Sequence, residues 1–149
     1  MSGDWIYDKG LVVVIEGICA SSCANYVFTA ARQKGLKKDS VMIWHGSSWQ
    51  KDADELYLQG DAYVVAWRER EVSFFEKIGV DHRITIYGLS RYPFRAYLGA
   101  IMVADPIEGF DFSIEDMARF GVTDVYAIEG EWNWREYTDC CNVVRMQLQ

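Results

Sequence analysis

The sequence has few of the features that mark disordered, fibrous or membrane-spanning proteins. It contains only two prolines and twelve glycines in 149 residues, too few for a disordered or collagen-like chain. Unbroken apolar runs such as 11–15 are far shorter than the roughly twenty residues that a membrane-spanning helix needs. Half of the residues are hydrophobic, and this length suits one domain with a single core. We therefore predict a soluble globular protein with one domain, residues 1–149.

Basic residues are also scarce. There are 15 Lys and Arg against 22 Asp and Glu, and no basic run is longer than Lys37–Lys38. Nucleic acid is not expected as the main partner, because binding to its backbone needs a basic surface. The first residues lack a basic segment followed by an apolar one, so no secretion signal is expected in the sequence as given. Either the protein is cytoplasmic or its beginning has been removed.

Cysteines are few and occur in two pairs, Cys19 with Cys23 and Cys140 with Cys141. Together with the histidines they match no usual spacing of zinc ligands, so we predict no metal site. Neighbouring cysteines rarely bridge each other, because a disulfide favours Cα atoms about 5.5 Å apart. Small buried thiols are the simplest interpretation of all four.

The order of apolar segments predicts an α/β fold. The run 11–15 is β-branched and apolar on both faces, which is typical of a strand buried in a parallel sheet. Small residues, then apolar ones, predict a helix from Ala20 to about Arg32. A polar turn is expected over 33–39, followed by a second buried strand over 41–44.

The second half continues the alternation. Ser113 as N-cap and Gly121 as C-cap make 113–121 the clearest helix of the chain. Segment 92–103 is ambiguous between helix and strand. The remaining expectations are one helix over 52–78 or two with a break near Gly60, a short strand or extended loop over 83–87, and a strand over 122–128.

Candidate chemistry lies where the first predicted helix begins. The turn before it carries Ser21, and a hydroxyl beside the N–H groups of a helix N-terminus is a possible nucleophile. His45 directly follows the second predicted strand. If the two strands are parallel neighbours, their carboxyl ends deliver both side chains to the same edge of the sheet. A serine and a histidine are two parts of an acyl-transfer site.

Three segments also carry a family resemblance. Residues 17–31 and 40–46 resemble the nucleophile and histidine segments of the Clp protease proteolytic-subunit family, within the crotonase-like superfamily. The form Cys-Ala-Ser-Ser-Cys is most similar to the periplasmic or secreted branch of Clp-like proteins. Residues 112–124 resemble the family's late helix that ends in an aromatic-Gly pair before a strand. Together the segments cover roughly half of the chain in matching order.

The resemblance implies a fold, an activity and a set of roles. The fold would be a superhelix of ββα units around a mainly parallel sheet. Ser21 would be the nucleophile, His45 the general base, and the backbone N–H of Ser22 an oxyanion donor. Asp111, or the less well placed Asp105, would orient the histidine. The family implies peptide or unfolded-protein substrates, homo-oligomers, no metal or organic cofactor, and a periplasmic or secreted location.

The chain departs from the family before Gly17. Family members carry a Gly-Gly turn on an earlier strand that completes the oxyanion hole, whereas only sixteen residues precede Gly17 here. Losing one such donor typically lowers the rate by about 10² to 10³. The alternatives are therefore a fragment truncated at its N-terminus or a weak or inactive binding and assembly module. Truncation would leave the edge of strand 11–15 open to self-association. A crotonase-type acyl-CoA enzyme is a further, less favoured alternative.

In an oxidising compartment the cysteines suggest a staple. Cys19 and Cys23 would lie close together across the first helical turn, and each could bridge to Cys140 or Cys141. This hypothesis ties the C-terminal segment to the nucleophile helix. Such a bridge would stabilise the fold by about 4 kcal/mol, because the closed loop exceeds a hundred residues.

Overall fold

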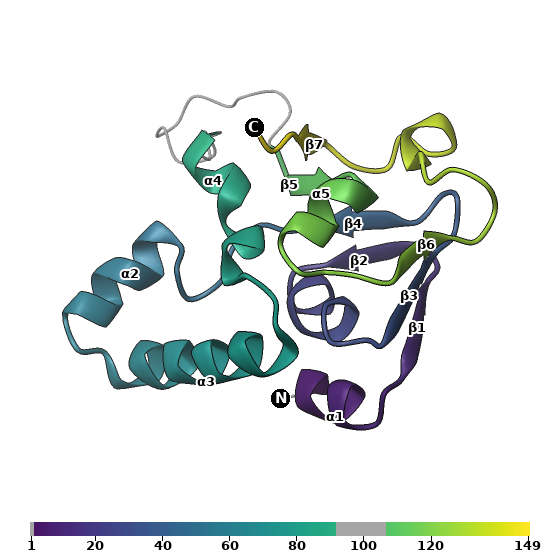
Figure 1. Cartoon of the computed structure of the whole chain (residues 1–149). Coiled ribbons are helices and arrows are strands. Elements are labelled where there is room, and N and C mark those ends of the chain that lie inside the picture. The colour runs from purple at the N-terminus through teal and green to yellow at the C-terminus, as the bar shows by residue number, and fades with distance from the viewer. Residues whose placement is uncertain (1, 92–106) are drawn as a thin grey trace.

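The computed structural model describes residues 2–91 and 107–149. The protein has a mixed α/β fold in which the paired strands are parallel, as the α/β class requires (Figure 1). The chain order of the elements is α1 (Ser2–Asp8), β1 (Val12–Ile15), β2 (Ile18–Ala20), η1 (Cys23–Phe28), β3 (Gln33–Leu36), β4 (Val41–Ile43), α2 (Lys51–Leu58), α3 (Ala62–Ile78), η2 (His82–Thr85), α4 (Tyr87–Arg91), β5 (Gly109–Phe112), α5 (Ile114–Arg119), β6 (Val125–Ala127), η4 (Trp134–Glu136) and β7 (Val143–Met146).

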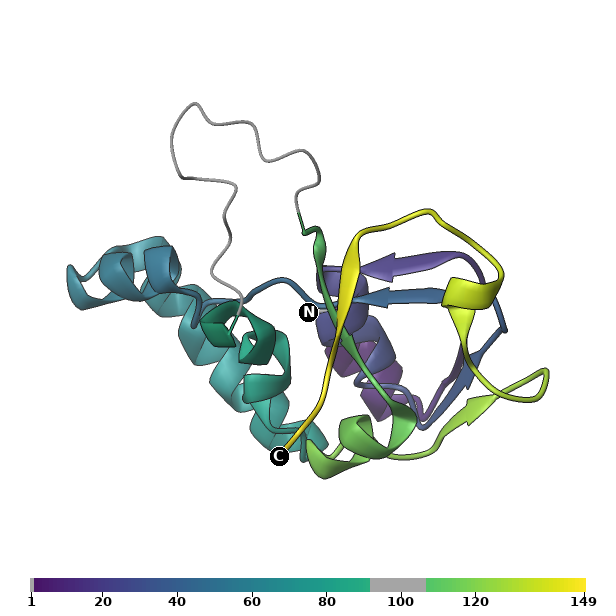
Figure 2. The same ribbon diagram turned by 90° about the horizontal axis from the view of Figure 1, so that it is seen from above.

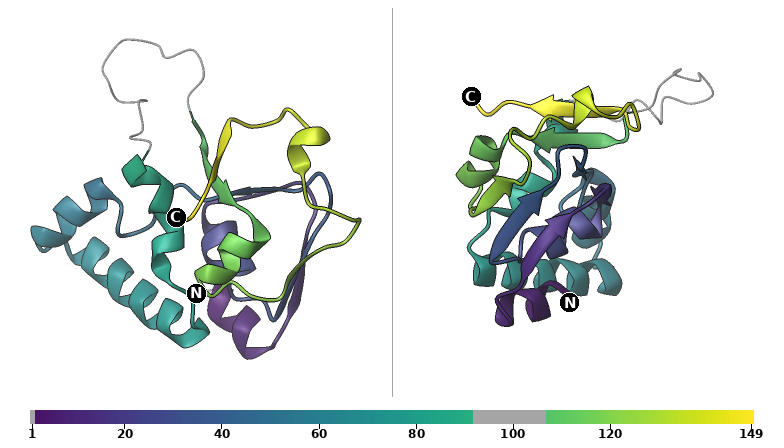
Figure 3. Two further views of the ribbon diagram at one scale, coloured as in Figure 1. Left: turned by 45° about the horizontal axis from the view of Figure 1, so that its top comes forward. Right: turned by 90° about the vertical axis from the view of Figure 1, so that its right-hand side faces the viewer.

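The described strands form three small sheets. The first has the order β1-β3-β6, the second pairs β2 with β4, and the third pairs β5 with β7. A single antiparallel bridge between Trp44 and Phe110 links β4 to β5 and so joins the last two sheets. The β5–β7 pair and α1 lie at opposite ends of the strand layer (Figure 3).

Helices cover one side of the strands. Figure 2 shows α1 and η1 between the strands and α3, while α2 extends away from the sheets. Buried side chains from α1 to β7 form one apolar cluster, with Trp44 and Phe112 among its fully buried members. In the described part of the chain, none of the helices is both long enough and apolar enough to cross a bilayer.

The first half differs from the sequence-based prediction in several ways. Strand 12–15 is present, but it lies at the edge of its sheet, and Val12 and Val14 are 47% and 48% exposed. The expectation of burial on both faces is therefore wrong. Residues 18–20 form a strand, so the helix expected from Ala20 to Arg32 is limited to Cys23–Phe28.

The most unexpected element is β3. Its sequence Gln-Lys-Gly-Leu predicted a polar turn, yet it is the central strand of its sheet. Lys34 is 4% exposed, and its ammonium donates hydrogen bonds to the carbonyl oxygens of Ala31 at 2.7 Å and Thr123 at 2.9 Å. Because these acceptors satisfy the buried charge, a residue that looks solvated in the sequence can lie inside the sheet.

The later elements agree better. Two helices separated at Gly60, with φ of 77°, confirm one of the two alternatives for 52–78. Ser113 caps α5 by accepting a hydrogen bond from the Asp116 N–H at 3.0 Å, and β6 falls within the strand expected over 122–128. The expectation for 83–87 is wrong, since this region is helical. Segment 92–103 lies outside the described residues.

Candidate active site

Ser21 occupies a turn with an unusual backbone. Its φ is 58°, a left-handed conformation that costs a residue with a side chain about 1–2 kcal/mol. The turn joins β2 directly to the segment that enters η1. The Ser21 N–H donates to the carbonyl of Ile43 at 3.1 Å, and the Ser21 carbonyl accepts from the Asn25 N–H at 2.8 Å. Two hydrogen bonds thus hold an exposed serine in a conformation that it would not adopt alone.

His45 lies at the same edge of the sheet. The parallel register pairs Ala20 with Ile43, so Ser21 directly follows the carboxyl end of β2 and His45 lies two residues beyond that of β4. The strand neighbouring β4 is β2, and not strand 12–15 as the sequence suggested. The parallel arrangement on which the Ser21–His45 pairing depends is therefore present, through a strand that the sequence analysis missed.

Asn25 connects the segment that follows Ser21 to the loop that carries His45, residues 45–48, called here the histidine loop. It lies on η1, is 3% exposed, and its Nδ2 donates to the carbonyl of Gly46 at 2.9 Å. The Thr29 hydroxyl in turn donates to the Asn25 carbonyl at 2.5 Å. The residue after His45 is thereby fixed to the helix that follows Ser21. No pattern in the sequence pointed to this asparagine.

Beyond Gly46, the histidine loop is anchored to α3. Glu71 is fully buried and accepts hydrogen bonds from the Ser48 N–H at 2.9 Å and from the hydroxyl of Tyr26. Burial and the neighbouring Glu71 carboxylate raise the pKa of Tyr26 above its ordinary value. Thr85 donates to the Ser47 hydroxyl at 2.7 Å. The loop is therefore held by η1 on one side and by α3 and η2 on the other.

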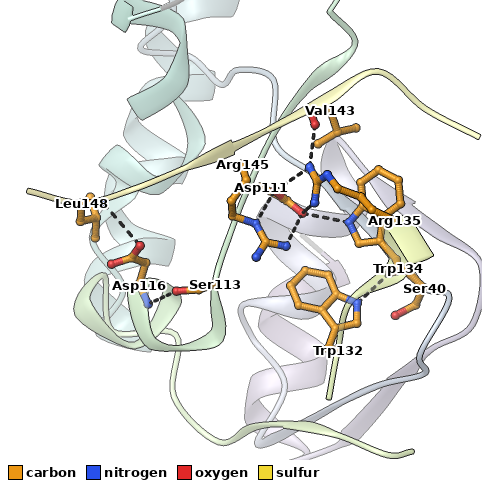
Figure 4. A network of polar contacts seen from close by, with 10 residues as sticks. All are labelled: Ser40, Asp111, Ser113, Asp116, Trp132, Trp134, Arg135, Val143, Arg145 and Leu148. Atoms are coloured by element: carbon orange, nitrogen blue, oxygen red, sulfur yellow. Dashed lines mark hydrogen bonds and ion pairs between the residues drawn. The ribbon is translucent and has the colours of Figure 1, made fainter. Parts of the chain in front are cut away.

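Asp111 lies in a different polar network (Figure 4). Its fully buried carboxylate accepts from Arg145 at 2.7 and 2.9 Å, from Arg135 at 3.2 and 3.3 Å, and from Trp134 at 3.0 Å. These contacts tie β5 to η4 and β7. His45 is not among the partners that the described chain offers to this carboxylate. The alternative Asp105 lies outside the described residues.

The cysteines pair differently from the staple that the sequence suggested. Cys19 bridges Cys23 across a Cα–Cα distance of 5.3 Å. Cys140 bridges its neighbour Cys141, so the described chain has no free thiol. The expectations of a tail staple, of free buried thiols and of an unbridged adjacent pair are therefore wrong. Cys19 and Cys23 are close because the turn between β2 and η1 brings the chain back upon itself.

Other candidate positions are separate from this site. A cavity of about 590 Å³ between α1 and α3 is lined by Asp4, Glu69, Arg70 and Lys77, among others, but by neither Ser21 nor His45. Among the described residues, no group of three or more His, Cys, Asp or Glu side chains could hold a metal ion. The strand-end serine and histidine therefore remain the arrangement with the clearest chemistry.

Comparison with known proteins adds no family assignment. No family model matches the chain, and no match was found among curated proteins or solved structures.

Proposed function

We propose that the protein is a serine hydrolase of the peptidase type, with Ser21 as nucleophile and His45 as general base. The observation that carries this proposal is the turn at Ser21. A serine with φ of 58° directly follows the short strand β2, and a histidine follows β4, the parallel neighbour of β2. Backbone strain in a non-glycine residue is often found where a reactive group must be presented at a fixed angle.

In the proposed reaction, the Ser21 hydroxyl attacks the carbonyl carbon of a peptide bond while His45 accepts its proton. His45 then donates that proton to the leaving amine, and water hydrolyses the resulting acyl-enzyme. The first N–H groups of a helix have no acceptor within it, so the N–H of Ser22, which directly precedes η1, is the proposed oxyanion donor. The N–H of Ser21 is excluded from this role because it already donates to Ile43.

The arrangement of strands supports the proposal that the fold is a Clp-like superhelix of ββα units. The chain passes from β1 to β2 and η1, and then from β3 to β4 and the helices that follow. Each strand of the first unit pairs in parallel with its counterpart in the second, β1 with β3 and β2 with β4. This repetition is what successive turns of one superhelix would produce.

The test is covalent labelling with a fluorophosphonate probe, which reacts with activated serines. Wild-type protein is expected to incorporate one probe, mapped to Ser21 by peptide mass spectrometry. Ser21→Ala should abolish labelling, and His45→Ala should slow it by at least about 10², the usual lower range for losing a general base. Ser22→Ala is the matched control, because it removes an adjacent exposed hydroxyl and retains its backbone N–H.

Each outcome separates the proposal from its alternatives. Folded wild-type protein that does not react with the probe would refute the hydrolase. Equal labelling of wild type and Ser21→Ala would refute the assigned nucleophile. Cleavage of an unfolded protein such as casein, lost in Ser21→Ala, would support peptide substrates over other acyl compounds.

A second candidate function is a non-catalytic binding or assembly module. The exposed face of β1 favours it, because Val12 and Val14 present apolar side chains on a strand at the sheet edge. Such edges are templates for pairing with another strand, so we propose that β1 contributes to a homo-oligomer. Labelling at Ser21 within an oligomer would show that assembly and catalysis occur together.

The disulfides support a proposed location. Disulfides persist in oxidising compartments and are rare in the cytosol. Because all four cysteines are bridged, we propose that the protein functions in the periplasm or outside the cell. Free thiols at Cys140 and Cys141 in protein isolated from its native compartment under alkylating conditions would refute this location.

A further inference from the structure

The Cys19–Cys23 disulfide encloses the proposed nucleophile. Cys19 lies on β2, Cys23 is the first residue of η1, and Ser21 is midway between them. We propose that this disulfide is a redox switch that holds Ser21 in its reactive backbone conformation. The hydrolase would be active when the bond is formed and largely inactive when it is reduced. This inference rests on the proposed function and adds the regulation of the same site.

The geometry explains how a bond beside Ser21 can control it. Cys19 is 1% exposed and is held in the sheet by its register with Met42. The bridge therefore fixes Cys23, and with it the start of η1, to a buried and paired residue of β2. Only three residues separate the two cysteines, so the ends of the turn cannot move apart. Within this closed ring Ser21 keeps a φ of 58°.

Without the bridge, the turn is held less firmly. The described backbone hydrogen bonds at Ser21 are its N–H to the Ile43 carbonyl and its carbonyl to the Asn25 N–H. A serine freed from the ring would shift towards right-handed or extended conformations, because the left-handed one is intrinsically less stable. Its hydroxyl would then no longer be presented steadily to His45.

The turn is also open to a reductant. Ser21 and Ser22 are exposed and Cys23 is partly exposed, while Cys19 is buried. A thiolate of a dithiol reductant can attack the Cys23 sulfur, and the Cys19 sulfur leaves as a thiolate that takes up a proton. The second thiolate of the reductant then displaces Cys23, which also takes up a proton. Two electrons pass to the protein disulfide, and the reductant closes into its own disulfide.

The chain supplies its own control in the second disulfide. Cys140 and Cys141 bridge each other in the C-terminal segment, outside the β2–η1 turn. The double variant Cys140→Ser/Cys141→Ser therefore retains only the Cys19–Cys23 bond. Any redox response that survives in this variant must arise at the turn that carries Ser21.

The experiment measures the rate of fluorophosphonate labelling in that double variant, oxidised and after reduction with dithiothreitol. Mass spectrometry with thiol alkylation verifies each redox state. We expect labelling to slow about tenfold on reduction, as the left-handed state loses population, and to recover on oxidation with oxidised glutathione. A quadruple variant that also carries Cys19→Ser/Cys23→Ser should be labelled at the slow rate under both oxidising and reducing conditions. Circular dichroism should show the same folded state throughout.

A further variant distinguishes positioning of Ser21 from a general effect on structure. His45→Ala should slow labelling strongly in the oxidised protein but little in the reduced one, because Ser21 no longer engages the imidazole there. Equal labelling rates in the two verified redox states would overturn the switch while leaving the hydrolase intact. Absence of labelling from the folded protein in both states would overturn the hydrolase itself. Unfolding on reduction and in Cys19→Ser/Cys23→Ser would refute local control of the turn.

Discussion

The left-handed backbone of Ser21 predicts that removing the proposed nucleophile can stabilise the protein. Ser21→Gly and Ser21→Ala both delete the hydroxyl, but only glycine adopts a φ of 58° without steric cost. The relief is about 1–2 kcal/mol, offset by about 0.4–1 kcal/mol because glycine gives the unfolded chain more freedom. Ser21→Gly should therefore be more stable than Ser21→Ala by about 0.5–1 kcal/mol.

Gly17 provides the control of opposite sign in the same region. Its φ is 86°, and a methyl group placed on it would meet no atom within 4 Å. Gly17→Ala therefore introduces backbone strain without a steric clash, and it should destabilise the protein by about 0.5–1 kcal/mol from the same two opposing effects.

The assay is urea unfolding followed by circular dichroism, with the oxidised protein in all cases. The three variants should share one slope and differ only in midpoint, since their folded and unfolded surfaces are nearly the same. For a chain of this length the thermal midpoint should rise by about 2 °C in Ser21→Gly relative to Ser21→Ala. If Ser21→Gly is no more stable than Ser21→Ala while Gly17→Ala behaves as expected, the inference of strain at Ser21 is wrong.

Three further predictions concern other parts of the chain. Asp111→Asn should destabilise the fold by about 3 kcal/mol, because the buried carboxylate forms ion pairs with two arginines. If the variant is fully folded but no longer labelled at Ser21, Asp111 has a catalytic role and not only a structural one. Burial lowers the pKa of His82 below its ordinary value of 6.5, so the folded state favours the neutral ring that stacks on Trp49 at 4.0 Å. The contribution of neutral His82 to stability is complete above pH 6.5, and it is lost as the pH falls towards the lower pKa of the folded state. Wild type should therefore lose more thermal stability than His82→Gln between pH 7.5 and 5. Val14→Lys should weaken self-association in analytical ultracentrifugation without loss of helicity, and an unchanged sedimentation profile of an oligomer would exclude β1 from the interface.

The sequence predicted correctly that Ser21 and His45 lie at one edge of a parallel sheet. It predicted less well the strands and helices that form this region. Strand 41–44 and the capped helix after Ser113 were recognisable because apolar residues and a cap mark them clearly. β2 was missed because it is only three residues long and lies next to the small residues that suggest a helix. β3 was missed because its buried Lys34 is satisfied by distant carbonyl groups, which local patterns do not reveal.

The same limitation applies to the site residues. Ser21 and His45 could be proposed together because each follows an apolar segment, although the strand that Ser21 follows, β2, was not the strand that the sequence predicted. The partners of Asp111 could not, since Arg135 and Arg145 approach it from the C-terminal segment. The closeness of Cys19 and Cys23 was expected, but their bridge to each other, in place of a bridge to Cys140 or Cys141, was not.

The hydrogen bond from Asn25 to Gly46 bears on how the protein would tolerate thermal motion. This bond couples the turn that carries Ser21 to the loop that carries His45. A displacement of η1 would therefore move both side chains in the same direction. Their separation would then vary less than the position of either one. Fluctuation of α2, which extends away from the sheets, would then leave the two groups of the proposed proton transfer aligned.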